Sequence, residues 1–510
     1  LAWTAASRTF SMIAFFWSIT RFGSLAAKCA NGYRADLVEG SVLVNTRESE
    51  IPGSFRDPKG RVFRRDGRIY RGITEHGLAD FEKVRSSGLL DDLAANGLLV
   101  PWWDADDAEL DAGEPVRKII EHAPLAFVSY PYEWSFGGLR AAALLHLEIQ
   151  LRALDRDVTL SDASAYNVQF DGPRPIFIDH LSFRPYRDGE YWLGHRQFCE
   201  QFLNPLLLRA CLGVPHNDWY RGSLEGIPSS ALATMLPLRA RLTPKVLTHV
   251  TLLARLERRV VRKGDAETSK IIARGRLPRR SHVGMLRALQ SWISGLRPRD
   301  AGAGPWSEYA DCSNYSADES GKKEAFVADF ATRTKPKILW DIGCNTGDYT
   351  KAALAAGTER AIGFEYDAKT LEIAFERSVA ETLQFLPLRM DLANPSPAQG
   401  WSQTERDGLW QRRNADGVLA LAILHHLCIS RNLPLAQVVP WIVGLAPCGV
   451  IEFVPKADPM AQQLLRNRED VFADYSDADF DRALAAVAKI AKSEKITDSG
   501  RRLVWYERNE

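Results

Sequence analysis

Short apolar runs alternate with helix-length segments from residue 336 to the end of the chain. The runs expected to form strands cover 338–342, 360–366, 384–390, 417–423, 449–454 and 503–507. Segments between them, such as 349–356 and 369–378, are expected to be helices. Such alternation is typical of βαβ units on a parallel sheet. The pattern therefore predicts a doubly wound, Rossmann-like α/β domain, which we place at residues 306–510.

The first half of the chain has a different pattern. Alternating residues with tight turns at 58–60 and 66–67 predict a β-meander. We assign 41–255 to an accessory α+β domain and leave 1–40 as an N-terminal segment without an assigned fold. Arginines are frequent in 256–305, which ends in a run of Ala, Gly and Pro. This stretch is predicted to be a basic linker, with a solvated helical connector favoured over a phosphate-binding or lipid-binding segment.

The composition is that of a globular protein. Of the 510 residues, 65 are basic and 64 acidic, and 45% are hydrophobic. These values exclude a disordered or polybasic chain, and a net charge of +1 gives no electrostatic reason to expect nucleic acid as a partner. The apolar run at 12–17 is too short to cross a bilayer, so we expect no stable membrane span. A secretory signal in the first thirty residues is the alternative left open.

Seven cysteines are scattered along the chain and form no C-x-x-C pair. An odd number without such spacing predicts reduced thiols, and neither a disulfide framework nor a zinc site. We therefore expect a cytoplasmic protein without a bound metal.

The first predicted strand of the carboxyl-terminal domain ends in a glycine-containing turn, DIGCNTG at 341–347. Gly343 and Gly347 allow the backbone to turn sharply and to approach a ligand closely. Dinucleotide sites use G-x-G-x-x-G to hold a pyrophosphate at the following helix. The G-x-x-x-G spacing after Asp341 instead suits a ligand without phosphate, whose charged amino-acid part meets a carboxylate and backbone amides.

Acidic residues also end the next two predicted strands. A carboxylate at Glu365 can accept two hydrogen bonds from the vicinal hydroxyls of a ribose. Glu365 is preferred for this role over Asp367, which we expect to cap the next helix. Asp391, after the third strand, is placed to accept a hydrogen bond from an adenine amine. With Asp341, these acids form a set suited to one nucleoside ligand.

Region 306–510 resembles the class I S-adenosylmethionine-dependent methyltransferases. The resemblance is carried by the glycine turn, by Glu365 and Asp391, and by the sequence AILHHL at 422–427. It implies that S-adenosylmethionine is bound by Asp341, Gly343, Cys344, Asn345, Gly347, Glu365, Asp391 and Leu424. In that family the protein mainly aligns the acceptor for attack on an already activated methyl carbon.

His425 and His426 follow the fourth predicted strand, where substrates of this fold are expected. A neutral imidazole at His425 could act as a general base near neutral pH. The alternative is that the pair closes the cofactor pocket. Trp306, Tyr309 and Tyr315 are expected to form either a lid over the cofactor or an ordinary packed cap.

Residues 162–179 resemble the catalytic segment of protein kinase-like phosphotransferases. The order is D-x-x-x-x-N, a hairpin, an apolar run and a second Asp. The resemblance implies that Asp162 orients an accepting hydroxyl, that Asn167 and Asp179 hold magnesium on ATP, and that 130–134 is a hinge.

This resemblance has departures. Arg71 is the nearest substitute for the expected strand lysine, no G-x-G loop is present, and His180-Leu181 follows Asp179. The alternative is a substrate-binding domain in which Asp162 caps a helix and Asp179 is a buried hydrogen-bonding acid.

Over its whole length the chain resembles the NoeA-like host-specific nodulation proteins. This implies a role in legume nodulation by a symbiotic bacterium, through a glycan or lipid-linked small-molecule acceptor. The first functional hypothesis is a methyltransferase with an accessory domain. The others are a bifunctional methyltransferase and phosphotransferase, and a regulatory protein that binds S-adenosylmethionine without catalysis.

Overall fold

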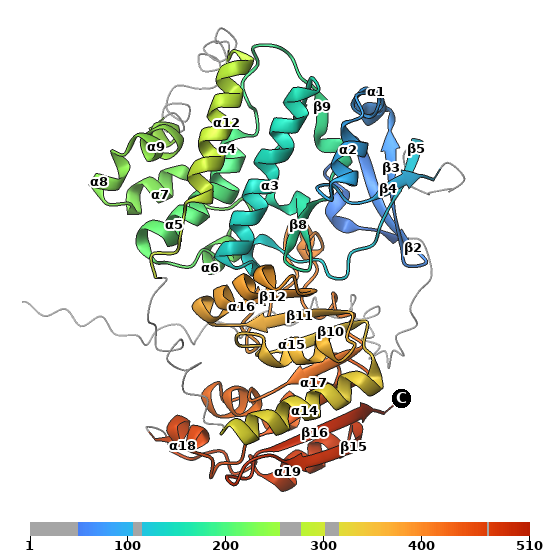
Figure 1. The fold of residues 1–510 in the computed structure, drawn as a ribbon, viewed down its shortest axis with the longest axis vertical. Helices are drawn as coiled ribbons and strands as arrows, with labels where there is room; N and C mark the ends of the chain where they lie inside the picture. Colours follow the sequence, from blue (N-terminus) through green and yellow to red (C-terminus); the bar gives the residue numbers. More distant parts are fainter. Residues whose placement is uncertain (1–48, 106–114, 256–276, 301–315, 467–468, 510) are drawn as a thin grey trace, which may run out of the picture. The chain divides into compact units, whose positions relative to one another are not determined.

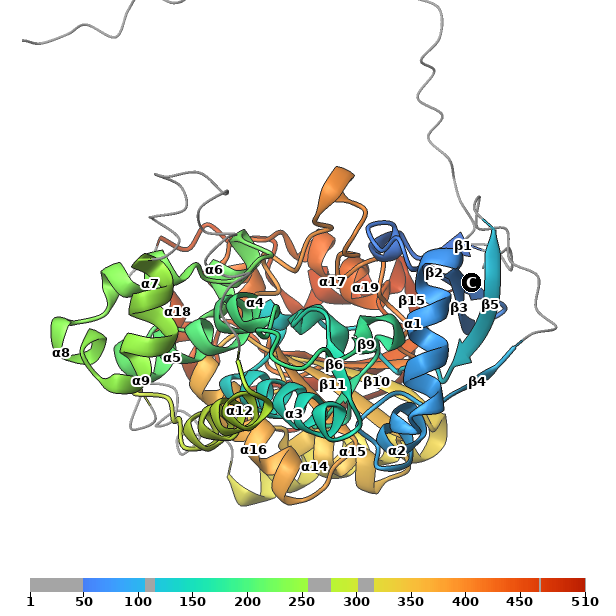
Figure 2. The same ribbon diagram turned by 90° about the horizontal axis from the view of Figure 1, so that it is seen from above.

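The computed structural model describes residues 49–105, 115–255, 277–300, 316–466 and 469–509 (Figures 1 and 2). Glu48–Glu510 forms one compact unit. The segment 1–40 and the aromatic residues of the proposed lid, Trp306, Tyr309 and Tyr315, lie outside the described residues. Among the helices described, none combines enough length with enough apolar character to cross a bilayer.

The N-terminal domain begins with a five-stranded antiparallel sheet in the order β1-β2-β3-β5-β4. Its strands are β1 (Ser49–Glu50), β2 (Gly60–Arg65), β3 (Arg68–Thr74), β4 (Trp102–Asp104) and β5 (Val116–His122). The predicted turn between β2 and β3 is confirmed, because Asp66 and Gly67 both have positive φ, at 50° and 76°. Such two-residue turns match the twist of the strands they join. Helices α1 (Glu75–Ser86) and α2 (Leu89–Ala95) follow β3.

The rest of this domain is mainly helical. Its central helix, α3 (Phe136–Asp155), begins at Ser135, whose side chain accepts a hydrogen bond from Gly138 N. The other helices are α4 (His195–Phe198), α5 (Asn204–Leu212), α6 (Asn217–Gly222), α7 (Ser229–Met235), α8 (Leu238–Arg241), α9 (Pro244–Val246) and α12 (Arg279–Ser294). Two π-helical segments continue α4 and α9, namely η5 (Cys199–Leu203) and η6 (Leu247–Thr251).

Short elements join these helices. Two antiparallel strand pairs are formed by β6 (Val158–Leu160) with β9 (Phe183–Pro185), and by β7 (Val168–Asp171) with β8 (Arg174–Phe177). Single 3₁₀ turns are η1 (Pro52–Ser54), η2 (Pro131–Glu133), η3 (Ala165–Asn167) and η4 (His180–Ser182).

Helix α12 lies within the stretch predicted to be a basic linker. Its buried residues include Leu286, Leu289 and Ile293, whose spacing puts them on one face of the helix. That face packs against α3. This part of the stretch is therefore folded onto the N-terminal domain, whereas 256–276 lies outside the described residues.

The carboxyl-terminal domain is built on a seven-stranded sheet in the order β12-β11-β10-β13-β14-β16-β15. The strands are β10 (Ile338–Ile342), β11 (Arg360–Glu365), β12 (Phe385–Arg389), β13 (Gly417–Ala420), β14 (Cys448–Phe453), β15 (Ala488–Lys495) and β16 (Arg502–Arg508). The first five are parallel, and β16 is antiparallel to both β14 and β15. The predicted doubly wound, Rossmann-like fold is confirmed.

Helices cover both faces of this sheet. Figure 2 shows α14, α15 and α16 on one side of the strands and α17 and α19 on the other. The helices are α14 (Ala317–Thr334), α15 (Asp348–Ala355), α16 (Ala368–Ala380), α17 (Leu435–Val443), α18 (Pro459–Leu465) and α19 (Asp477–Ala485), with short turns η7 (Trp401–Gln403) and η8 (His426–Ser430).

The six predicted strands are all present, with small differences at their ends. Strand β13 ends at Ala420, earlier than predicted, and the chain turns at Ala422, which has a φ of 50°. Strand β15 was not among the predicted strands, because its sequence AKIAKSEK has too few apolar residues. It lies at the edge of the sheet, where lysines are common because they discourage pairing with another chain.

A buried ion pair joins the two domains. Arg412 donates to both carboxylate oxygens of Glu133, at 2.9 and 2.5 Å, and both side chains are almost fully buried. The guanidinium also lies 4.5 Å from the ring centre of Tyr130. The segment 130–134, predicted as a hinge, is therefore held in a packed contact with the carboxyl-terminal domain.

Candidate functional site

The strand order changes direction at β10 and β13, which pair in parallel. Strands β12, β11 and β10 follow one another in one direction, and β13 and β14 extend the sheet in the other. Because the connections diverge at this point, ligands of such sheets bind in the crevice beyond the carboxyl ends of the strands. The glycine turn after β10 and the segment after β13 both lie here.

The glycine turn has the backbone shape that the sequence predicted. Gly343 and Gly347 have φ values of 82° and 85°. A Cβ atom on Gly347 would lie 2.7 Å from Cε1 of Phe385, so glycine is required there by both conformation and space. The backbone N–H groups of Gly343 and Cys344 donate to the carbonyl of Phe364 at 2.8 and 3.1 Å. The turn is thereby fixed to the end of β11.

Glu365 is held by two backbone donors. Its Oε2 atom accepts from Asn345 N at 3.0 Å and its Oε1 atom accepts from Asp367 N at 2.8 Å. Burial raises the pKa of Glu365, and these hydrogen bonds act against that shift. The carboxylate is therefore tied to the glycine turn on one side and to the start of α16 on the other. Asp367 caps α16 as predicted, accepting from Lys369 N and Thr370 N.

Asp341 lies beneath the turn and not at the open edge with Glu365. Its side chain is only 2% exposed, and its Oδ2 atom accepts from Thr350 Oγ1 on α15 at 2.5 Å. Burial raises the pKa of Asp341 to about 6. The structure thus does not bring together all three of the acids that the sequence grouped.

Asp391 belongs to a charged and aromatic cluster at the end of β12. Its Oδ1 atom accepts from Ala393 N and its Oδ2 atom from Arg431 Nη2, both at 3.0 Å. The Arg431 guanidinium lies 5.5 Å from the ring centre of Tyr366, a side chain that is 54% exposed. The sequence analysis missed Tyr366 and Arg431. An aromatic residue directly after Glu365 was a signal that could have identified the first.

His425 is a buried histidine at the start of the π-helical turn η8. It is 1% exposed, and its Nδ1 atom has no hydrogen-bond partner within the described chain. Burial lowers the pKa of His425 well below its ordinary value, and the neighbouring His426 and Arg501 lower it further. The ring is therefore neutral near pH 7. Leu424 and Cys344, which were both predicted to contact the cofactor, are buried. Leu424 directly precedes His425, and Cys344 belongs to the glycine turn.

The sequence analysis also did not predict a buried ionic network between α14 and β14. Lys323 on α14 pairs with Glu452 on β14 at 2.7 Å, with 2% and 0% of the two side chains exposed. Arg501 pairs with Asp458 at 2.7 Å and lies near Glu452. These residues are far apart in sequence and have no common motif, so only the fold reveals their contact.

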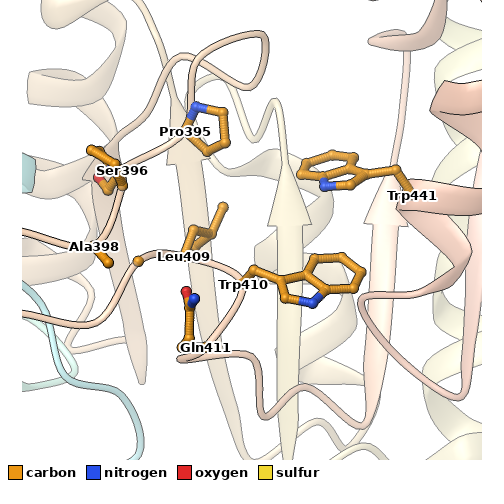
Figure 3. A pocket seen from close by; sticks show the side chains of 9 residues that line it. Pro395, Ser396, Ala398, Leu409, Trp410, Gln411 and Trp441 are labelled. Carbon is orange, nitrogen blue, oxygen red and sulfur yellow. The ribbon is translucent and has the colours of Figure 1, made fainter. Parts of the chain in front are cut away.

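A separate hollow lies beside α17. It has a volume of about 320 Å³, and Figure 3 shows the indole rings of Trp410 and Trp441 on one side and Pro395 and Leu409 on the other. Its other lining residues are Ser396, Pro397, Ala398, Gly408 and Gln411. None of the residues predicted to bind the cofactor lines this hollow.

The three residues of the kinase-like segment do converge in the N-terminal domain. Asn167 Nδ2 lies 3.3 Å from Asp162 Oδ2 and 3.4 Å from Asp179 Oδ2. Arg71, which is 8% exposed, forms an ion pair with Asp179 Oδ1, and Asp179 also accepts from Leu181 N at 3.1 Å.

The two carboxyl groups of this cluster have opposite shifts. Burial raises the pKa of Asp162 to about 6, with the charge of Asp179 adding to the effect. Burial also acts to raise the pKa of Asp179, but the charge of Arg71 and the hydrogen bonds outweigh it and hold that pKa below its ordinary value. Asp179 is thus a buried acid with its own fixed cation, whereas Asp162 caps none of the described helices and accepts from Asn167.

Comparison with known proteins identifies a close relative. No family model matches the chain. The nodulation protein NoeA of Rhizobium meliloti (strain 1021) is 45% identical over 471 residues, which cover 92% of this chain and 98% of the relative.

Solved structures resemble part of the chain only distantly. The N-methyltransferase NodS from Bradyrhizobium japonicum WM9 has 11% identity and a TM-score of 0.30, covering 38% of this chain and 99% of its own. Magnesium protoporphyrin IX methyltransferase from Synechocystis PCC 6803, with bound SAH, has 16% identity and a TM-score of 0.28, covering 38% of this chain and 84% of its own. At these scores the likeness carries no argument about activity. The identity to NoeA, in contrast, extends over nearly both full lengths, and the chain belongs to the NoeA family of nodulation proteins.

Proposed function

We propose that the protein is an S-adenosylmethionine-dependent methyltransferase whose cofactor lies beyond the carboxyl ends of β10 and β13. The observation that carries the proposal is the position of Glu365, at the end of β11 and aligned by the N–H groups of Asn345 and Asp367. Each carboxylate oxygen has two lone pairs and uses one for a backbone donor. Both oxygens can therefore accept from the hydroxyls of a ribose while these bonds remain.

The other predicted residues receive roles by their positions. The backbone of the turn at Gly343, Cys344, Asn345 and Gly347 would line the cofactor by close approach, because its four N–H groups already donate within the protein. Leu424 would form an apolar wall. Asp391 would accept from the adenine amine, with Tyr366 beside it. Asp341, which is buried under the turn, is proposed to hold α15 and the turn in place through Thr350.

In the reaction, the bound cofactor supplies an activated methyl group. The chain's own part would be to align the acceptor with that methyl group and to take up the proton that the acceptor loses. His425 is proposed as the base because its Nδ1 atom lacks a partner within the described chain. The acceptor is proposed to be a glycan-type or lipid-type small molecule of nodulation, with the reaction taking place in the cytoplasm.

Calorimetry with S-adenosylmethionine and S-adenosylhomocysteine tests cofactor binding. We expect the wild-type protein to bind both and Glu365→Ala to lose at least tenfold in affinity, because the ribose hydroxyls lose a charged acceptor. Glu376→Gln, at an exposed acid on α16, is the matched control and should bind normally. The absence of binding by the wild type, or equal binding by both variants, would refute the proposal.

Catalysis needs a separate test. Incubating the protein with cell extract and cofactor labelled in its methyl group should transfer the label to a product, which mass spectrometry then identifies. Binding without any labelled product would favour the regulatory, non-catalytic alternative.

A second candidate function is phosphate transfer by the N-terminal domain. The convergence of Asp162, Asn167 and Asp179 favours it. The ion pair of Arg71 with Asp179 opposes it, because it uses a carboxylate oxygen that magnesium would need. If the function is present, ATP with magnesium should raise the melting temperature of the wild type but not of Asp179→Asn, whereas no rise in the wild type rejects it.

A further inference from the structure

Two histidines and a cysteine meet in the helical part of the N-terminal domain, away from both sites discussed above. His195 Nε2 lies 3.0 Å from His249 Nδ1 and 3.7 Å from Cys199 Sγ. One ligand atom from each of the three residues lies within 4.8 Å of the other two. Cys199 and His249 are buried, whereas His195 is partly exposed.

The local helix geometry brings these side chains together. His195 and Cys199 are four residues apart along α4 and η5, so they lie on one face of the same helix. His249 comes from η6, in a part of the chain about fifty residues later. Cys199 begins one π-helical segment and His249 lies in the middle of the other. Such segments are rare and are found frequently at functional sites.

The spacing of the three atoms fits a single metal ion. Ligand atoms around a tetrahedral zinc ion lie roughly 3.3 to 3.6 Å apart, given metal–ligand distances of about 2.0 Å to nitrogen and 2.3 Å to sulfur. The two distances from His195 are close to these values. Every ligand atom of the three residues lies within 4.8 Å of the others, so small side-chain rotations can bring all three separations into this range.

The exposure of the three residues suits a bound ion, since Cys199 and His249 are buried and His195 is partly exposed. The partial exposure of His195 gives an ion a route from solvent.

We propose that His195, Cys199 and His249 form a binding site for one zinc-class transition-metal ion. Two imidazole nitrogens and one thiolate are the ligand set that such ions prefer over magnesium or calcium. Binding converts the Cys199 thiol to a thiolate and releases its proton to solvent. A water molecule or a further protein group completes four-coordination.

The position of the site indicates a structural role. The ion would cross-link η6 to the α4–η5 helix, two elements that share a hydrogen bond between histidines here. Trp192 and Trp292 pack on the outer sides of His195 and His249, with ring centres 5.7 and 6.1 Å away. Their rings shield the ligands laterally.

Cobalt substitution of the full-length, untagged protein tests the proposal. The protein is stripped with a chelator, then titrated with Co²⁺ and separately with Zn²⁺. We expect about one ion per chain, a thiolate-to-cobalt charge-transfer band, and a melting temperature that rises on metal addition. Cys199→Ser should lose the charge-transfer band, and His249→Ala should weaken binding by at least tenfold. Cys211→Ser, at a partly buried thiol of α5, is the matched control and should behave as the wild type.

The wild-type measurements keep the proposal falsifiable even if a variant fails to fold. A wild-type protein that takes up no Co²⁺ or Zn²⁺ at micromolar concentration overturns it. A cobalt complex without a charge-transfer band also overturns it, because Cys199 is then not a ligand. If Cys211→Ser lost the charge-transfer band as fully as Cys199→Ser, the band could not be assigned to a Cys199 thiolate and the proposal would fail.

Discussion

Glu365 and Asp179 are both acids just beyond the end of a strand, but they are held in opposite ways. Glu365 accepts from two backbone N–H groups, whereas Asp179 is paired with the buried guanidinium of Arg71. Backbone donors fix a carboxylate while leaving it a net charge and lone pairs for a ligand. A guanidinium neutralises that charge inside the protein. The comparison indicates that the carboxyl-terminal acid is arranged for a ligand and the N-terminal acid for stability.

The largest expected effect comes from removing the cation beside Asp179. Arg71→Met should lower the free energy of unfolding by about 3–5 kcal/mol, because it leaves a buried carboxylate unpaired. Denaturant unfolding monitored by circular dichroism measures the loss. The double variant Arg71→Met with Asp179→Leu should regain most of it, since no charge is then left buried. A loss as small as that of Arg333→Ala, which breaks an exposed pair on α14, would contradict a structural role for this pair.

Asp341 should make the stability of the protein depend on pH. In the described structure no cation is bonded to its carboxylate, which accepts instead from the hydroxyl of Thr350. Burial raises its pKa from 3.8 to about 6, so the folded state holds a proton that the unfolded state loses. This stability is fully present below about pH 4 and is lost as the pH rises to 6, a change of roughly 2–3 kcal/mol. Asp341→Asn should remove that part of the pH dependence. Unfolding curves of both proteins between pH 4 and 7 measure it, and parallel pH profiles would show that the pKa is not raised.

The glycine turn next to Glu365 can be tested by adding a side chain to it. Gly347→Ala introduces a Cβ atom 2.7 Å from Phe385 at a residue with a φ of 85°, so we expect a loss of about 2 kcal/mol in stability and weaker cofactor binding. Gly357→Ala is the matched control, because its φ is 114° but no atom lies within 4 Å of the new Cβ. It should show the backbone strain alone. Similar cofactor affinity in both variants would separate the turn from the binding site.

The smallest expected effect is at the exposed ring beside Glu365. Tyr366→Ala should lower the affinity for S-adenosylmethionine a few-fold, corresponding to about 1 kcal/mol for a lost aromatic contact with adenine. Stability should hardly change, because 54% of the side chain is already exposed. Calorimetry measures the affinity. An unchanged affinity would place the adenine away from Tyr366.

The sequence predicted the carboxyl-terminal architecture well because the signals there are local. Parallel buried strands are short apolar runs, and a strand followed by glycine and a helix cap specifies its own turn, so the glycine turn and the Asp367 cap were both found. The polar edge strand β15 lacked that signal. The arginine-rich stretch was predicted to be a solvated helical connector, whereas α12 buries three apolar residues, spaced three and four positions apart, against α3.

Tertiary contacts decided which of the predicted site residues lie close together. The sequence grouped Asp341, Glu365 and Asp391 by their positions after successive strands. Strand direction does not fix where a side chain points, and the fold turned Asp341 toward α15 while leaving the other two near the edge. The same limit concealed the meeting of His195 and Cys199 with His249, since metal-ligand spacing was sought only in short motifs.

Local patterning in the amino-acid sequence by itself determined the order of the parallel strands and their helices, the glycine turn and the Rossmann-like fold class. Packing decided the electrostatic state of each acid. Whether a carboxylate accepts from an amide, a hydroxyl or a guanidinium depends on residues that are distant in the chain. Burial makes the effect of that partner on the pKa of the carboxyl group larger, because charges interact strongly where water is excluded.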